Sequence, residues 1–449
     1  MDTGFRRYDE INDVHPDGSF AMNPSNKDNS WRYITLAAAA MLMITMGARQ
    51  AQGLFLFPIS GSTGVSIVAI SFAMAVGQFM WGLAQPVAGA CADRFGFTPV
   101  LIGGVLLLAV GTALTPFFTS SFGLVVTIGI LTAVGSGAGS FSVMIGALAQ
   151  RLAPKERATA SGLITGGGSF GQFLFAPITQ TLISTWGWMG AMWSLGAISL
   201  LALPLVKPVI GPARHSGALG DASRDGGMKA TLRKAFGNSS YLLLHGSFLT
   251  CGFHIAFLVT HLPGEVDLCG LPASVASWSL GIIGLSNIAG SFAAGWMLNH
   301  FRGKYILFGM YGSRTLLILL YLAAPKTEWT FYLMAIGLGF SWLGTAPPTA
   351  GVVGKLFGTR YLATLYGLTM LSHQTGAFFG AWLGGLAFAH YGNYLWMWYA
   401  DALFAAVAAL LNLPIREPRV ERAAVPHDSK LGLPALVRRF SHHEGPSAA

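Results

Sequence analysis

Apolar runs long enough to cross a lipid bilayer recur twelve times along this chain of 449 residues, and they limit its fold more than any other feature. A hydrocarbon core of about 30 Å needs about 20 helical residues, and a helix satisfies its own backbone there. Only 10% of the residues are charged, against about 25% in soluble domains. The sequence therefore predicts an all-α membrane protein with twelve transmembrane helices, near residues 33–57, 66–90, 98–118, 122–149, 158–184, 187–206, 239–263, 273–298, 304–324, 329–353, 361–388 and 392–414.

The positions of lysine and arginine predict how these helices are oriented. Cytoplasmic loops of membrane proteins collect both residues. With the amino terminus placed inside, every Lys and Arg falls in a cytoplasmic loop or tail except Lys326, Arg49 and Arg314. We therefore expect a multi-pass protein of the cell inner (plasma) membrane with both termini cytoplasmic.

Polar segments divide the chain into five parts. The first of them lacks the apolar core of a signal peptide, and the longest internal loop separates six spans from six. The expected parts are a cytoplasmic N-terminal tail (1–32), an N-terminal six-helix bundle (33–206), a cytoplasmic linker (207–238), a C-terminal six-helix bundle (239–414) and a cytoplasmic C-terminal tail (415–449).

The two bundles are also repeats of one another. A shift of 205 positions aligns their first, fourth and fifth helices, and such repeats are typical of transporter folds. The sequence thus predicts two pseudo-symmetric halves. The residues that meet an identical residue at this shift are Gly47, Pro58, Gly146, Ala158, Thr159, Gly162, Leu163, Gly171 and Phe173.

Other patterns argue against catalysis, cofactors and nucleic acid. The basic residues are dispersed instead of clustered with aromatic residues. Cys91, Cys251 and Cys269 lack metal-ligand spacing, so we expect packing residues. A GxSxG pattern at 167–171 lies inside an expected membrane helix instead of a strand-to-helix turn, and no Walker A motif occurs. We expect no enzyme activity, no cofactor, no metal site and no nucleic-acid partner.

The loop after the second expected helix carries a recognisable motif. Gly89, Asp93, Arg94 and Gly96 have the spacing GxxxDRxG, which resembles the loop signature of the major facilitator superfamily. The resemblance covers residues 33–414 and implies two bundles that rock about a central cavity. In such a gating motif Asp93 could cap a helix start and pair with Arg94 as the halves move.

A second segment narrows this resemblance. Residues 155–166 are similar to the entry of the fifth helix in the monocarboxylate porter and oxalate/formate antiporter group. Two departures are the absence of an acidic-Gly signature in the first helix and Ser291 where those groups carry an arginine. The resemblance implies a secondary carrier for a small organic anion, monocarboxylate-like, moved by proton symport or exchange, with a monomer as the functional unit.

Arg49 and His254 are the strongest candidates for substrate binding. They lie at matched positions of helices 1 and 7, which line the central cavity in this superfamily, so we expect them to face one another across it. Arginine binds carboxylates with a bidentate fork, and histidine titrates near neutral pH. The structural alternative is that Arg49 snorkels to the interface and His254 is a packing residue.

Further polar residues inside expected spans complete the candidate substrate site. Polar groups in hydrocarbon are costly and often functional, although hydrogen bonds between helices explain them as well. The candidates are Gln50, Gln78, Trp81 and Gln85 in the first two helices, Trp342 and Thr345 in the tenth, and His373 and Gln374 in the eleventh.

Arg314 and Asp401 lie in helices 9 and 12, which are peripheral in this superfamily. Arg314 is about 15 Å from one membrane surface and Asp401 about 13 Å from the other, at 1.5 Å per residue. Across about 30 Å these depths nearly coincide. We therefore expect a structural ion pair, with direct proton coupling as the alternative.

Two other functional classes stay open at this point. The aromatic content, 12% of the chain, would also suit an efflux carrier for hydrophobic or drug-like compounds. A non-transporting membrane sensor or scaffold is the third class. The expected partners are a small, anionic substrate and the lipid bilayer.

Overall fold

The computed structural model describes residues 30–140, 143–144, 147–148, 152, 154–210, 227–358 and 361–418. Within these ranges the secondary structure is helical and contains no strand. Uninterrupted apolar runs form helices here because each backbone N–H then finds a carbonyl within its own segment.

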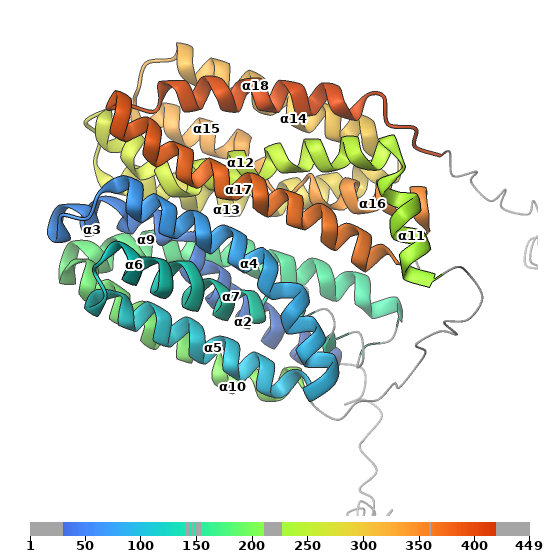
Figure 1. The fold of residues 1–449 in the computed structure, drawn as a ribbon, viewed down its shortest axis with the longest axis horizontal. Helices are drawn as coiled ribbons and strands as arrows, with labels where there is room; N and C mark the ends of the chain where they lie inside the picture. Colours follow the sequence, from blue (N-terminus) through green and yellow to red (C-terminus); the bar gives the residue numbers. More distant parts are fainter. Residues whose placement is uncertain are drawn as a thin grey trace, which may run out of the picture. The chain divides into compact units, whose positions relative to one another are not determined.

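The first half of the chain builds six spans, seen in blue and green in Figure 1. Short irregular segments (η) interrupt the first, third and fourth of them. The elements are α2 (Ser30–Gln50), η1 (Gln52–Phe55), α3 (Leu56–Thr63), α4 (Ile67–Phe95), α5 (Phe97–Leu114), η2 (Thr115–Phe117), α6 (Ser121–Leu124), the π-helix η3 (Val125–Thr132), α7 (Ala133–Ala138), α9 (Pro154–Leu200) and α10 (Leu203–Val209).

The second half repeats this plan after a short amphipathic helix. Its elements are α11 (Gly227–Phe236), α12 (Ser239–Leu268), α13 (Ala273–Leu298), α14 (Gly303–Ala323), α15 (Glu328–Ser341), α16 (Ala346–Phe357), α17 (Leu362–Tyr391) and α18 (Leu395–Asn412).

The number of membrane crossings follows from these elements. Nine helical segments of the described chain are long and apolar enough to cross a membrane. One of them, Thr159–Val209, holds two crossings, because Gly187 interrupts α9 with a φ of 69°. The pair α15 and α16 and the helix α17 supply the remaining two. The predicted fold of twelve spans in two six-helix halves is confirmed.

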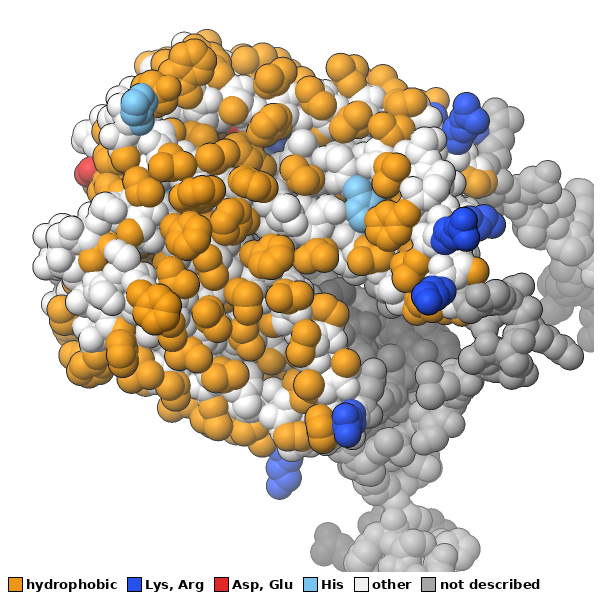
Figure 2. Space-filling view, in the orientation of Figure 1, with side chains coloured by type: hydrophobic (Ala, Val, Ile, Leu, Met, Phe, Trp, Pro, Cys, Tyr) orange, Lys and Arg blue, Asp and Glu red, His pale blue; other side chains and the backbone are white. Residues whose placement is uncertain are grey.

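The turns between spans gather at two opposite ends of the bundle (Figure 1). Glycines with positive φ, which side chains disfavour, mark both ends. We call the end with the turns at Gly64, Gly187, Gly270 and Gly392 the Gly64 end, and the other the Gly96 end. On the visible face in Figure 2, apolar side chains cover the middle, as a lipid-facing surface requires, and Lys and Arg gather towards the Gly96 end.

A contact between the halves recurs at pseudo-symmetric positions. Asn287 on α13 donates a hydrogen bond to Ser169 on α9, with 2.7 Å between Nδ2 and Oγ. The positions 205 residues away from these two are Gly82 on α4 and Gln374 on α17, and they also touch, since a methyl group added at Gly82 would overlap Gln374. The same pair of contacts therefore joins the halves twice.

The fourth helix of each half is broken at the same place. In the second half α15 ends at Ser341 and α16 begins at Ala346, with a turn between them. In the first half α7 ends at Ala138 and a turn follows at Gly139. Gly139 and Gly344 are 205 positions apart, so both halves carry an interrupted helix at equivalent depth.

Two segments that the sequence places outside the bundles have described structure. The linker 207–238 contains α11 near its end. Glu417, expected in the tail, is buried and accepts hydrogen bonds from the N–H groups of Gly303 (3.1 Å) and Lys304 (3.0 Å) and from Lys355 Nζ (2.6 Å). A carboxylate suits the amino end of α14 because the helix dipole is positive there. Residues 1–29 and 419–449 of the two tails lie outside the described residues.

Candidate functional site

Arg49 lies in the last turn of α2 and is turned inward against α4. Its side chain is 7% exposed. Its Nη2 donates a hydrogen bond to Oε1 of Gln78, and its guanidinium carbon lies 4.3 Å from the centre of the Trp81 ring. Within the described part of the chain no carboxylate lies within ion-pair distance of it. Arg49 is thus a buried cation with an amide oxygen and an aromatic face beside it but no described counter-ion.

Local sequence explains why α2 ends where it does. The chain tightens into the 3-10 helix η1 at Gln52. Gly53 in this segment packs on the backbone of Val259, where any side chain would overlap the carbonyl oxygen. The close approach of η1 to α12 therefore places Arg49 near the boundary between the halves.

Gln374 reaches the same region from the other half. It lies on α17 against Gly82, the residue after Trp81 on α4. Its Nε2 lies 3.3 Å from Nδ1 of His373, and its Oε1 has no partner among the described residues. The His373 ring packs 4.9 Å from that of Phe248. The structure thus brings Gln374 close to the Trp81 end of the Arg49 site.

Gln50 and Gln85 belong to the edges of this region. Gln50 is half-buried at the end of α2, directly after Arg49, and Gln85 is half-buried one turn beyond Trp81 on α4. Trp81 is itself buried, and its indole N–H has no partner in the described chain.

His254 lies inside the second half and pairs with Asp401. The distance between His254 Nδ1 and Asp401 Oδ2 is 2.6 Å, and both side chains are buried. The imidazole thus contacts α18, and no hydrogen bond joins it to Arg49 within the described residues. That the two residues face one another across a cavity stays a prediction.

Arg314 is held mainly by hydrogen bonds to backbone carbonyl oxygens. Its Nη2 donates to the carbonyl oxygens of Ser341 (2.6 Å) and Trp342 (3.4 Å), which end α15, and its Nε donates to the Ser341 hydroxyl (3.3 Å). Its Nη1 lies 3.4 Å from Cys251 Sγ. The broken tenth helix leaves these carbonyls free, and a cation suits a helix carboxyl end.

The predicted ion pair of Arg314 with Asp401 is therefore wrong in its partners. Asp401 accepts its hydrogen bond from His254, although its charge still attracts Arg314. The counterparts 205 residues earlier, Ala109 and Gly196, are in contact. The rotation of α12 about its axis decides that the Asp401 carboxylate meets His254. The spacing of residues along the sequence does not reveal this rotation.

Trp342, Thr345 and Cys251 complete this buried cluster. Trp342 is fully buried in the helix break, and its ring lies 6.0 Å from that of His254. The hydroxyl of Thr345, at the start of α16, lies 3.6 Å from Cys251 Sγ. Cys251, expected to be a packing residue, thus has polar partners on two sides.

Asn287 is a connecting residue that the sequence reasoning missed. Besides its bond to Ser169, its Oδ1 accepts a hydrogen bond from the backbone N–H of Leu343 at 2.9 Å, inside the break of the tenth helix. An asparagine within an apolar run was the available signal, since such residues are rare in membrane helices.

The loop motif is described only in part. Asp93 lies in the last turn of α4, and its side chain lies outside the described residues. Gly96 ends α4 with a φ of 87° and precedes α5, which begins without a side-chain cap. The expected role of Asp93 as a cap therefore stays a prediction. The Arg94 guanidinium lies 5.2 Å from the Phe95 ring, and Gly89 has no described atom within 4 Å of its Cβ position.

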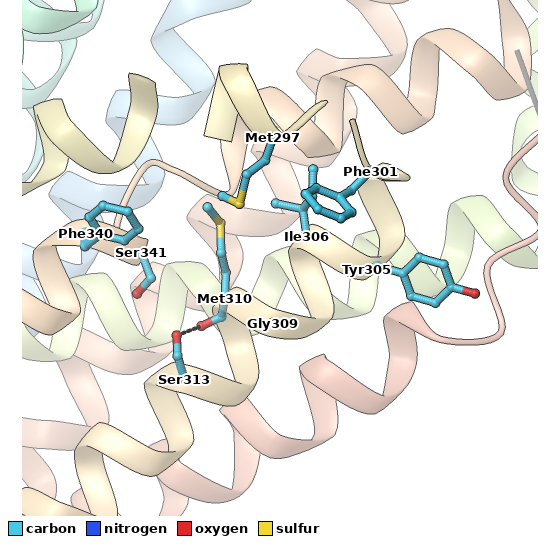
Figure 3. Close-up of a pocket in the computed structure, with 9 residues that line it drawn as sticks. All are labelled: Met297, Phe301, Tyr305, Ile306, Gly309, Met310, Ser313, Phe340 and Ser341. Carbon is cyan, nitrogen blue, oxygen red and sulfur yellow. Dashed lines mark hydrogen bonds between the residues drawn. The ribbon is translucent and has the colours of Figure 1, made fainter. Parts of the chain in front are cut away.

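An apolar cavity of about 290 Å³ lies between α13, α14 and α15, where Ser341 connects it to the Arg314 cluster. Figure 3 shows methionine and aromatic side chains around it, with Ser313 and Ser341 as polar members. Its lining contains no charged residue, so it has nothing to hold an anion. The lining residues are Met297, Phe301, Tyr305, Ile306, Gly309, Met310, Ser313, Phe340 and Ser341.

Similar proteins of known name include carriers of small anions. Monocarboxylate transporter 13 of Rattus norvegicus is 25% identical over 404 residues, covering 86% of this chain and 90% of the relative. The oxalate:formate antiporter of Oxalobacter formigenes is 25% identical over 392 residues, covering 85% and 90%.

Solved structures and a family profile agree on the fold. A D-xylose–proton symporter superposes with a TM-score of 0.66 at 15% identity, covering 86% of this chain and 97% of that structure. The profile described as Major Facilitator Superfamily matches residues 38–381 and 270–443. With twelve spans in two pseudo-symmetric halves, this chain belongs to the Major Facilitator Superfamily and is a transporter, not an enzyme.

Proposed function

We propose that the protein is a secondary carrier of a small organic anion, monocarboxylate-like, which binds between the halves at Arg49. One observation carries this proposal: Arg49 is a buried cation without a carboxylate partner among the described residues. An uncompensated charge in a membrane interior is costly, so such a site favours a ligand of opposite charge.

The surroundings of Arg49 suit a carboxylate. The Trp81 face and Gln78 hold the guanidinium in one orientation, and no described hydrogen bond occupies its other N–H groups. A fixed planar fork can donate two parallel hydrogen bonds to a carboxylate. The amide of Gln374, on the opposite half, could add a donor once the halves close. The relatives named for monocarboxylates, oxalate and formate support the same substrate class.

Uptake into proteoliposomes tests this assignment. We would measure exchange of labelled L-lactate and oxalate by wild-type protein and by Arg49→Ala, Arg49→Lys and Arg32→Ala. Arg32 is exposed near the start of the same helix and serves as the matched control. The expected result is a loss of about tenfold or more in Arg49→Ala, a smaller loss in Arg49→Lys and none in Arg32→Ala. Undiminished exchange by Arg49→Ala would exclude the role.

A second candidate function is efflux of hydrophobic compounds. The apolar cavity between α13, α14 and α15 favours it, because that cavity could take an uncharged aromatic molecule. Under this alternative, competition among substrates would follow their lipophilicity, and Arg49→Ala would be tolerated.

The proposal includes an orientation and an oligomeric state. Both termini lie on the cytoplasmic side of the inner membrane, which is the side of the Gly96 end, and the monomer is the functional unit. The charge distribution supports the orientation. An impermeant thiol reagent applied to intact cells should fail to label a cysteine at Ser429 and should label one at Lys326. The reverse pattern would contradict the orientation.

A further inference from the structure

The His254–Asp401 pair is a buried ionisable group that anion binding at Arg49 does not use. Both residues are 1% exposed, on α12 and α18 of the second half. Each has a second polar atom, His254 Nε2 and Asp401 Oδ1, that has no partner among the described residues. Buried polar atoms are nearly always bonded, so two open atoms on one pair are unusual.

The geometry fixes where a further proton would go. The 2.6 Å contact between Nδ1 and Oδ2 requires one proton between them. With Asp401 ionised, that proton resides on Nδ1, so Nε2 carries a free lone pair. A second proton taken from water then binds Nε2 and converts the pair into an imidazolium and a carboxylate.

The charges around the pair are compatible with binding of this proton. Arg314 on α14 contributes one positive charge, and Asp401 balances it while the imidazole is neutral. The other titratable groups near this cluster are Cys251 on α12, Tyr311 on α14 and His373 on α17. α13 carries no charged residue, and the broken tenth helix faces His254 with the Trp342 ring.

We propose that His254 and Asp401 form the binding site for a coupling proton, which makes the carrier a proton–anion symporter. This inference rests on the proposed function, because the proton is the partner of the anion at Arg49. A monoanion adds one negative charge and the proton adds one positive charge, so loading both leaves the charge of the membrane interior unchanged. Reorientation of the loaded carrier then moves no additional charge through the membrane.

Variants that remove the pair test the site. Asp401→Asn and His254→Asn each remove one member, and the double variant removes both, with Arg314 still held by the carbonyl oxygens of Ser341 and Trp342. His261→Asn is the matched control. His261 lies two turns further along α12, is equally buried, and its Nε2 contacts the carbonyl oxygen of Ala381 at 2.7 Å instead of a carboxylate.

Two transport modes separate proton coupling from anion binding. Exchange of L-lactate across the membrane needs no net proton movement, whereas accumulation against a gradient in an acidic bath needs it. Protein is reconstituted with pyranine in the lumen, so that proton entry is seen as acidification. In the wild type we expect accumulation with acidification.

The expected result for the single and double variants is exchange within about twofold of the wild type, with gradient-driven accumulation at least about tenfold lower and no acidification. His261→Asn should accumulate like the wild type. Accumulation and acidification by the double variant at wild-type levels would overturn the proposal. So would wild-type accumulation without acidification, whether or not the variants fold. A wild type that exchanges no anion contradicts the proposed function, whereas one that exchanges but couples no proton contradicts this inference alone.

Discussion

Arg314 illustrates how a membrane protein can bury a cation without a hydrogen-bonded acid. Two backbone carbonyls and a hydroxyl at the end of α15 accept from its guanidinium. The Ser341 carbonyl has no other described donor, and a lost bond in a water-free interior costs about 1–3 kcal/mol. The Trp342 carbonyl also accepts from the Thr345 hydroxyl at 3.4 Å. The arginine and the broken helix therefore stabilise one another.

Replacing Arg314 should destabilise the second half. For Arg314→Met we expect a loss of about 3 kcal/mol, because the carbonyls of Ser341 and Trp342 lose their donor and Asp401 loses a nearby positive charge. Arg314→Lys should lose less stability, since lysine keeps the positive charge. Some loss should remain, because an ammonium reaches fewer acceptors. Unfolding of the purified protein in detergent measures both, and Arg302→Met, at the start of the same helix, is the control. Wild-type stability in Arg314→Met would refute this account.

Candidate residues of the site follow from the sequence, but their partners do not. That Arg49 is a candidate, and that Arg314 and Asp401 lie at similar depth, follows from apolar context and from the rise of a helix. The partners do not follow, because the rotation of each helix about its axis is set by packing. His254 pairs with Asp401 for this reason, and Cys251 and Asn287 acquire partners that their spacing does not indicate.

At the scale of single elements, glycines determine which helix faces approach closely. On α17, Gly376 packs so tightly on the Leu249 carbonyl that an added methyl group would overlap it. Gly367, on the same helix, has no described atom within 4 Å of its Cβ position. Both positions are glycines of one helix, and only the structure distinguishes them.

The two glycines should respond oppositely to alanine. Gly376→Ala should destabilise by about 1–3 kcal/mol through overpacking against backbone that cannot yield. Gly367→Ala should be neutral or stabilise by up to about 1 kcal/mol, because alanine is the better helix former. Thermal unfolding of both variants in the same detergent makes the comparison. Equal effects of the two substitutions would contradict the role of packing at Gly376.

Asn287 links three elements, so its removal should affect more than one. Asn287→Ala leaves the N–H of Leu343 and the hydroxyl of Ser169 without their partner, and we expect a loss of about 1–3 kcal/mol. Asn299→Ala, at the exposed end of the same helix, should change stability by less than about 0.5 kcal/mol. Chemical unfolding followed by tryptophan fluorescence measures both, and indistinguishable values would contradict a linking role.

At the scale of the whole molecule, the halves meet closely at the Gly64 end. Phe57 packs on Phe388 with ring centres 5.4 Å apart, and Phe72 lies 5.7 Å from Trp382. Ser71 on α4 touches Gly385 on α17. Alternating access requires such contacts to separate once in every transport cycle.

A cross-link between Ser71 and Gly385 should therefore stop transport. In the double variant Ser71→Cys/Gly385→Cys a Cβ at Gly385 would lie 2.5 Å from Cβ of Ser71, so a disulfide forms once the two helices separate by about 1 Å. Oxidation should abolish exchange in proteoliposomes, and a reductant should restore it, whereas each single variant should be insensitive to both. Full exchange by the oxidised, cross-linked protein would show that these faces stay together throughout the cycle.

The architecture was largely predictable, and the reason is physical. Span length, loop charge and the 205-residue repeat follow from bilayer thickness and from duplication, which act on the whole chain. The break in the tenth helix and the anchoring of Glu417 depend on individual hydrogen bonds between residues far apart in the sequence. No pattern along the chain records those.

The matched breaks at Gly139 and Gly344 have an unequal consequence for backbone dynamics. Arg314 and Asn287 hold the break in the second half. Their counterparts 205 residues earlier are Ala109 and Gly82, which carry no polar side chain, and Thr45 reaches the Gly139 carbonyl only at 3.5 Å. Amide deuterium should therefore enter the backbone at Gly139 and Ser140 sooner than that at Leu343 and Gly344.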